Sequence, residues 1–428
     1  MLRSAQRARL EARTTPMRLL FACALLVLCN AGARAQNPDK QSFEVIEHGR
    51  YMAIAGDCAA CHTAKGGQPF AGGGALQTPF GTLLAPNITP DVETGIGGWT
   101  DDQFVEAAQN GIGHGGLHLY PAMPYTYYTK MTREDVIAIR AYLETLQPVR
   151  NLVQANQLPF PFNQRETMVG WNELYFRPGE FKPDPGKSTE WNRGAYLVEG
   201  AEHCGLCHTP KNVMGGDENS QMMQGSVLQS WYAPNLTGNR RVGIGDWTVD
   251  DIALYLKTGR NRYDIASGPM ADAVTNSTSH LTDADLRAIA VYLKDLPAGA
   301  GSSPQPISAQ DPAMQQGQSI YNNQCAACHT AGGEGIVGLF PRLSGVPLVQ
   351  QSQATSLIRV VLEGSRAVAT DGAPTGPAMP SFAWRLSDAD IAAVITYIRN
   401  AWGNAASQVS AGEVSNMRQA LHRQAQAP

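Results

Sequence analysis

Three short cysteine and histidine motifs carry most of the chemistry that this sequence could perform. Eight cysteines occur in the 428 residues, and six of them form three Cys-x-x-Cys pairs, each followed directly by a histidine. On one helical turn, two thiols at this spacing reach the two vinyl groups of one porphyrin, and the next residue places its imidazole under the iron. The motifs therefore predict three covalently bound c-type haems, attached at Cys58, Cys61 and His62, at Cys204, Cys207 and His208, and at Cys325, Cys328 and His329.

Other uses of cysteine fit this pattern less well. A thioredoxin-like pair would not explain a following histidine in all three motifs, and zinc knuckles lie roughly 15–20 residues apart, much closer than these pairs. Structural disulfides would suit an exported protein, but the two cysteines outside the motifs, Cys23 and Cys29, lie in the N-terminal segment. Haem attachment is thus the preferred interpretation.

Each iron also needs a sixth ligand, and three methionines occupy matching positions. Met123, Met270 and Met379 each follow a middle helix of a repeated unit and adjoin a proline that stiffens the loop. A methionine more often fills a core, but the repeated position predicts axial ligation, which raises the reduction potential relative to two histidines. Both axial positions would then be filled, leaving no open iron site. Three nearby histidines are alternative ligands: His114, His118 and His280.

One proline follows each attachment motif. Pro86, Pro234 and Pro341 are candidates to offer a backbone carbonyl to the proximal imidazole, which would orient the ring and tune its basicity. The alternative is that they are ordinary turn prolines.

A repeated set of helices must position these motifs. The helix before each motif carries a glycine and a tyrosine, at Gly49 and Tyr51, Gly194 and Tyr196, and Gly317 and Tyr321. Middle helices are predicted to begin at the N-caps Thr100 and Thr248 and to end at Gly111 and Gly259, with a looser version ending near Gly364. Closing helices with one apolar face begin at the N-caps Thr132, Thr282 and Ser387. The tyrosine that recurs in each of them is expected to be a core residue: Tyr142, Tyr292 and Tyr397.

These patterns predict an all-α chain with three small domains in series. The boundaries are placed at 36–176, 188–298 and 312–404, and proline-rich stretches at 178–188 and 299–312 read as loops or linkers. Residues 158–176 are more apolar than a linker requires, so they either pack one domain on another or face a partner or membrane. The last segment, 405–428, reads as a polar tail with little apolar face.

The first 35 residues have the pattern of an export signal. Arginines precede an apolar stretch that is too short to span a bilayer comfortably, and Ala33-Arg34-Ala35 forms a cleavage site. A membrane anchor is the alternative, and either Met1 or Met17 could be the start. Without these residues, which hold six arginines and one glutamate, the formal charge is about −9 instead of −4. Such a charge argues against nucleic acid as a partner.

The motifs resemble those of a known family. The chain is similar to the trihaem cytochrome c subunits of membrane-bound periplasmic dehydrogenases. The similarity lies in the haem layout over about 42–402 and in four short stretches, 79–82, 87–91, 119–125 and 193–197. That family serves quinoprotein alcohol dehydrogenases and flavin-dependent gluconate, sorbitol, fructose and aldehyde dehydrogenases, and related subunits serve molybdenum hydroxylases. The resemblance implies three class-I-like cytochrome c domains in tandem, and it carries the attachment cysteines, the histidines and the three methionines over to this chain.

The resemblance also implies a function and a place in the cell. The expected role is an electron-transfer subunit, not catalytic by itself, in the periplasm at the outer face of the inner membrane. It would accept electrons singly from a catalytic flavin, pyrroloquinoline quinone or molybdenum subunit, with or without a small third subunit, and pass them to ubiquinone or the respiratory chain. The polar C-terminus leaves surface patches or the partner as the membrane attachment. The alternatives are a free periplasmic shuttle to a terminal oxidase and a multihaem catalytic cytochrome.

Overall fold

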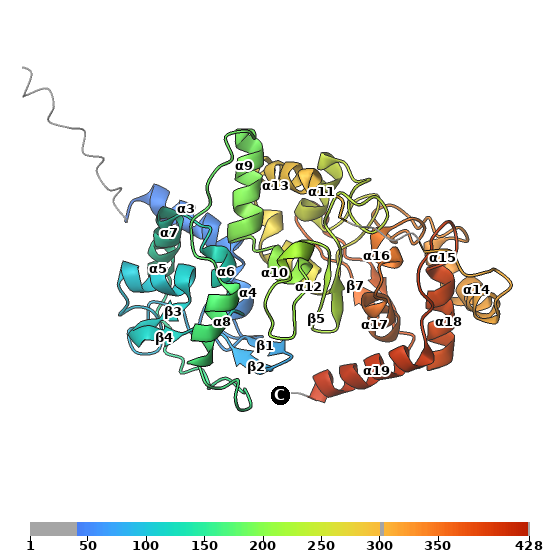
Figure 1. The fold of residues 1–428 in the computed structure, drawn as a ribbon, viewed down its shortest axis with the longest axis horizontal. Helices are drawn as coiled ribbons and strands as arrows, with labels where there is room; N and C mark the ends of the chain where they lie inside the picture. The colour runs from blue at the N-terminus through green and yellow to red at the C-terminus, as the bar shows by residue number, and fades with distance from the viewer. Residues whose placement is uncertain (1–40, 300–303, 427–428) are drawn as a thin grey trace, which may run out of the picture.

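The computed structural model describes residues 41–299 and 304–426 (Figure 1). The expected export segment, 1–35, lies outside the described residues. Three helical units follow one another, with the second unit between the first and the third in Figure 1. Within the described ranges, no helix is both long and apolar enough to cross a membrane.

The first unit runs from a long helix to a closing helix, with the attachment motif directly after the first. Its elements are α3 (Phe43–Ala55), α4 (Cys58–His62), β1 (Ala75–Thr78), β2 (Gly81–Leu84), α5 (Asp101–Asn110), β3 (Ile112–Gly113), the short 3₁₀ turn η1 (His114–Gly116), β4 (Leu117–His118), α6 (Tyr125–Tyr128) and α7 (Arg133–Glu144). Helix α8 (Thr167–Tyr175) follows it. The strands form small antiparallel hairpins, β1 with β2 and β3 with β4.

The second unit repeats this order. Its elements are α9 (Thr189–Tyr196), the π-turn η2 (Leu197–Ala201), α10 (Gly205–His208), η3 (Asn219–Gln221), β5 (Ser226–Leu228), β6 (Trp231–Ala233), α11 (Val249–Thr258), α12 (Pro269–Asn276), η4 (Thr278–His280) and α13 (Asp283–Asp295). Strands β5 and β6 form the hairpin that corresponds to β1 and β2.

The third unit is followed by an additional helix. Its elements are α14 (Pro312–Gln324), α15 (Ala326–His329), α16 (Pro347–Gln350), α17 (Thr355–Glu363), β7 (Ser365–Arg366), β8 (Ala378–Met379) and α18 (Asp388–Ile398), and α19 (Ala411–Gln426) comes last.

The predicted helix ends are confirmed. Thr100 and Thr248 each form a capping box at the start of a middle helix, and Gly111 and Gly259 end those helices in the left-handed conformation. The side chains of Thr132, Thr282 and Ser387 each accept a hydrogen bond from the backbone N–H three residues later. Gly364 caps α17. These caps satisfy backbone groups that a helix end leaves unpaired.

In each unit the first and closing helices cross at a glycine. A Cβ atom built on Gly49, Gly194 or Gly317 would overlap a backbone carbonyl of the closing helix. A side chain at these positions would therefore push the two helices of a pair apart: α3 and α7, α9 and α13, or α14 and α18. The recurring glycine is thus a packing requirement, because only it lets the two backbones approach this closely.

The first two units share one apolar core, and a tyrosine of each unit bonds to the start of the other unit's closing helix. Tyr51 of α3 donates its hydroxyl hydrogen to Asp285 of α13 (2.6 Å) and accepts a bond from the Thr282 backbone N–H. Reciprocally, Tyr196 of α9 bonds to Asp135 of α7 and accepts from the Thr132 N–H. Buried residues of both units form one apolar cluster. The two units therefore form a nearly symmetric pair.

The third unit has its own core, and the C-terminal segment belongs to it. Val414 and Leu421 of α19 are buried in the apolar cluster that contains Tyr321 and Ile391. Helix α19 therefore has an apolar side, whereas the sequence predicted a polar tail with little apolar face over 405–428. The segment is polar in composition, but its few apolar residues fall on one side of the helix and cover α17 and α18.

The apolar segment 158–176 has two kinds of surface. Trp171 and Phe176 are buried in a cluster with Tyr125, and the Trp171 indole N–H donates to the carbonyl of Met214 in the second unit (3.0 Å). The segment thus packs one unit on another, in agreement with one of the two expectations. Phe160, by contrast, is 80% exposed.

Candidate functional site

Each attachment histidine makes the same contact. The Nδ1 atoms of His62, His208 and His329 lie 2.7, 2.7 and 2.8 Å from the backbone carbonyl oxygens of Pro86, Pro234 and Pro341, respectively. The predicted carbonyl contacts are confirmed. Because a carbonyl only accepts, Nδ1 must carry the hydrogen, which leaves the Nε2 lone pair free for a metal.

The environment of these histidines favours the neutral form, in which an imidazole nitrogen can bind a metal. Burial lowers the pKa of His62, His208 and His329, while the carbonyl hydrogen bond acts in the opposite direction. All three rings lie at the end of a short helix, and the two cysteines of each motif lie in that helix or at its N-cap, so the thiols and the imidazole project from one turn. These thiols are the atoms that would form the thioether bonds.

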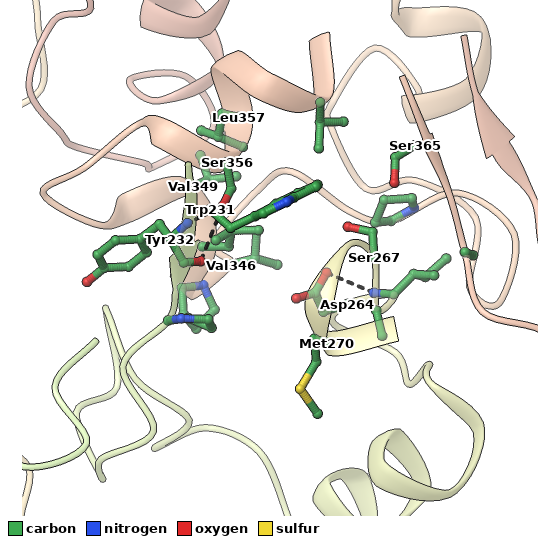
Figure 2. Close-up of a pocket in the computed structure, with 18 of the residues that line it drawn as sticks. Trp231, Tyr232, Asp264, Ser267, Met270, Val346, Val349, Ser356, Leu357 and Ser365 are labelled. Atoms are coloured by element: carbon green, nitrogen blue, oxygen red, sulfur yellow. Dashed lines mark hydrogen bonds between the residues drawn. The ribbon is translucent and has the colours of Figure 1, made fainter. Parts of the chain in front are cut away.

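A mostly apolar cavity of about 450 Å³ lies between the second and third units. It is lined by Cys204, Cys207, His208 and Met270 of the second unit and by Cys325, Cys328, His329 and Met379 of the third. Figure 2 shows Met270 pointing into it from the start of α12. The structure thus brings each of these two methionines into the same space as its predicted histidine, and it joins the two predicted haem sites in one cavity.

The first predicted site is supported by side-chain packing. Met123 and Cys58 pack against the same apolar cluster, and Met123 also contacts the cluster around Tyr125 and Trp171. Helix α8 therefore supports the loop that carries this methionine.

The three alternative histidines lie in different surroundings. His114 and His280 are exposed; the His114 ring lies 5.8 Å from that of Trp99, and His280 Nε2 lies 3.0 Å from the Thr275 carbonyl oxygen. His118 is partly buried, and its Nδ1 has no hydrogen-bond partner among the described residues.

Two unpartnered donors in the cavity wall fit a haem. The indole N–H of Trp247 and the Nε–H of Arg342 are buried, and neither has a partner in the described part of the chain. A buried donor without an acceptor costs about 1–3 kcal/mol. Haem carries two propionate groups, whose oxygens would accept from such donors. One donor comes from the second unit and one from the third, so the residues fit one haem in each.

A carboxyl group also lines this cavity. The Ser277 hydroxyl lies 3.3 Å from the Ala55 carbonyl oxygen and 3.2 Å from one oxygen of Glu202. A hydroxyl has one hydrogen to donate; if it goes to Ala55, the contact with Glu202 is a hydrogen bond only when Glu202 is protonated. Burial, the main cause, raises the pKa of Glu202 to about 8. The structure thus places a carboxyl group whose pKa is raised by burial beside the second site.

The sequence analysis did not identify three residues that line the cavity: Trp247, Arg342 and Glu202. Trp247 stands in the repeated stretch before a middle helix, where Trp99 is its counterpart. That repetition is a usable signal, because a tryptophan shared by two repeats beside a haem motif needs a partner for its N–H. Arg342 and Glu202 carry no comparable signal in one sequence.

Comparison with known proteins shows which family this chain belongs to. The cytochrome c family matches residues 46–147 and 314–402. The gluconate 2-dehydrogenase cytochrome c subunit of Pantoea cypripedii is 39% identical over 92% of this chain and 94% of its own length. The cytochrome c subunit of the quinone alcohol dehydrogenase of Gluconobacter oxydans is 37% identical over 94% and 87%, respectively. The fructose dehydrogenase cytochrome subunit of Gluconobacter japonicus is 36% identical over 92% of this chain and 87% of its own length. The chain therefore belongs to the cytochrome c family, in the group that holds the cytochrome c subunits of gluconate, alcohol and fructose dehydrogenases.

Proposed function

We propose that this chain is a trihaem electron-transfer subunit of a periplasmic dehydrogenase complex, built from three class-I-like cytochrome c domains in tandem. The observation that carries the proposal is the single cavity that joins the second and third sets of cysteine, histidine and methionine. Haem c, the cofactor of the family, supplies one-electron redox chemistry when bound. A shared cavity lets two such groups lie close enough to exchange electrons.

In this proposal the protein's residues hold the haems and tune them. The attachment residues are Cys58, Cys61, Cys204, Cys207, Cys325 and Cys328, and the iron ligands are His62 with Met123, His208 with Met270 and His329 with Met379. The proline carbonyls fix each imidazole, and the apolar walls exclude water. Histidine and methionine would together serve as the protein ligands of each iron, a pair that raises the potential relative to two histidines.

The first haem would lie next to the second. Tyr128 of the first unit donates to the carbonyl of Gly56, just before the first motif, and its ring lies 5.6 Å from that of His203, just before the second motif. The two attachment segments thus meet at this tyrosine. Together with the shared cavity, this supports a linear order in which the second haem links the other two.

The partner would be a catalytic dehydrogenase subunit, with ubiquinone or the respiratory chain as the acceptor. Gluconate, alcohol and fructose dehydrogenases are the enzymes named for the relatives described above. The expected location is the outer face of the inner membrane.

The test is purification of the tagged protein from native membranes. Copurification of a flavoprotein, quinoprotein or molybdenum hydroxylase in fixed stoichiometry, with a mass that corresponds to three haems per chain, is the expected result. A chain that emerges alone would contradict the subunit role. A mass corresponding to two haems would contradict the trihaem assignment. Carbon monoxide binding by the reduced protein would reveal an open iron and contradict the methionine ligands.

A further inference from the structure

Strand β6 makes one of the contacts between the second and third units. The backbone N–H of Tyr232 donates to the Ser356 hydroxyl of α17 (2.8 Å), and that hydroxyl lies 3.2 Å from the Tyr232 carbonyl oxygen. The Tyr232 hydroxyl donates to Gln351 (3.0 Å). Figure 2 shows Tyr232 and Ser356 along one side of the cavity. Strand β6 is therefore fixed to the third unit by both backbone and side chain.

Trp231, the preceding residue on β6, is held from both units. The guanidinium group of Arg359, on α17, lies 4.6 Å from the centroid of the Trp231 ring, and it also donates to the Gln229 carbonyl (2.8 Å). On the second unit, the indole packs against Gly268, where a Cβ atom would come within 2.6 Å of the ring. Gly268 precedes Met270 by two residues, so the indole supports the loop of the proposed ligand.

The internal repeat shows that this tryptophan is particular to the second unit. Aligning Ala85-Pro86-Asn87 with Ala233-Pro234-Asn235 puts Leu83 at the position of Trp231. Both residues pair across their hairpins, Leu83 with Leu76 and Trp231 with Leu228. The hairpin is thus common to the two units, while the aromatic residue occurs only where the hairpin lies against α17.

We propose that Trp231 is a positioning residue for electron exchange between the second and third haems. Its indole lines the cavity that both sites share. Because the indole lies between Arg359 of the third unit and Gly268 of the second, it fixes the distance between the two sites and the position of the Met270 loop. In each exchange one iron passes from ferrous to ferric and the other from ferric to ferrous, and no bond is made or broken. This inference rests on the proposed function.

The experiment compares Trp231→Leu, which copies the first unit, with Trp231→Phe and the unchanged protein. One electron or less per molecule is injected into the oxidised, isolated chain by a laser flash with a flavin photoreductant, and electron redistribution among the haems is followed by absorption. Haem content and the three reduction potentials are measured on the same samples. As a control, Trp384→Leu removes a tryptophan that is 78% exposed.

Loss of a group that orients a metal ligand typically costs about 10–100-fold, so Trp231→Leu should slow the redistribution about tenfold or more. It should also shift one potential, while Trp231→Phe should restore most of the rate and Trp384→Leu should change neither quantity. An unchanged rate with three haems bound would overturn the proposal. If Trp231→Leu fails to bind haem, Arg359→Gln tests the same clamp, and unchanged redistribution in that variant would also overturn it. Because the isolated chain is used, failure to find a dehydrogenase partner is a separate result.

Discussion

The crossing glycines offer a quantitative test of the fold. In a Gly194→Ala variant, the new Cβ atom would overlap the Ala288 carbonyl and lie 2.9 Å from Tyr292 Cβ. Forced overlap in a packed core typically costs about 1–3 kcal/mol. The obstacle here is backbone and not a flexible side chain, so the cost should lie at the upper end. Alanine's intrinsic helix preference returns up to about 1 kcal/mol, which leaves a net loss of about 2 kcal/mol.

Gly170→Ala is the matched control. Gly170 also lies within a helix, α8, but a Cβ atom there would have nothing within 4 Å. The same chemical change should therefore stabilise by up to about 1 kcal/mol. Thermal unfolding followed by far-ultraviolet circular dichroism measures both variants. At roughly 2–4 °C per kcal/mol, Gly194→Ala should melt several degrees lower than the parent and Gly170→Ala slightly higher. Equal stability of the two variants would refute the close helix crossing.

Three further predictions concern the proposed haem sites. Met270→Leu and Met379→Leu should each lower the potential of one haem in a redox titration, because the thioether ligand is lost; unchanged potentials would disprove the ligand assignment. Trp247→Phe should lower one potential, since a propionate without its donor is a stronger negative charge beside the iron, and an unaltered titration would count against that contact. Glu202 has a folded pKa of about 8, above its usual 4.5. Its contribution to stability is therefore fully present below pH 4.5 and lost as the pH rises through 8, so Glu202→Gln should flatten this decline in melting temperature. An equally steep decline in the variant would show that another group causes it.

The parts of the fold that local sequence encodes could be predicted. Helix caps such as Thr100 depend on contacts three residues away, and the proximal carbonyl of Pro86 depends on a turn close to its motif. The repeated glycines are visible as a pattern, but their purpose is not. A backbone crossing between α9 and α13 joins residues that are far apart in the sequence, which no periodicity reports.

The unpredicted parts all depend on how units pack on one another. Residues 405–428 read as a tail because few of them are apolar, yet the third core needs only Val414, Leu421 and a few partners to hold the helix. The joining of two predicted haem sites in one cavity depends on where β6 lies against α17. Glu202 and Arg342 are ordinary surface residue types by composition, and only the assembled cavity wall gives them a role.

The reciprocal bonds of Tyr51 and Tyr196 determine which parts of this protein can be exchanged. Each tyrosine bonds to a carboxylate at the start of the other unit's closing helix, and Asp285 is only 9% exposed. Grafting one unit from a relative without these partners would break both bonds between the units, although Asp285 would keep its contact with Arg193 and Asp135 its contact with His48. Grafting residues 41–298 as one piece keeps both bonds. A chimera should therefore inherit the first two proposed haem sites together, as a single cassette, whereas the third unit can be replaced if its new surface accepts β6.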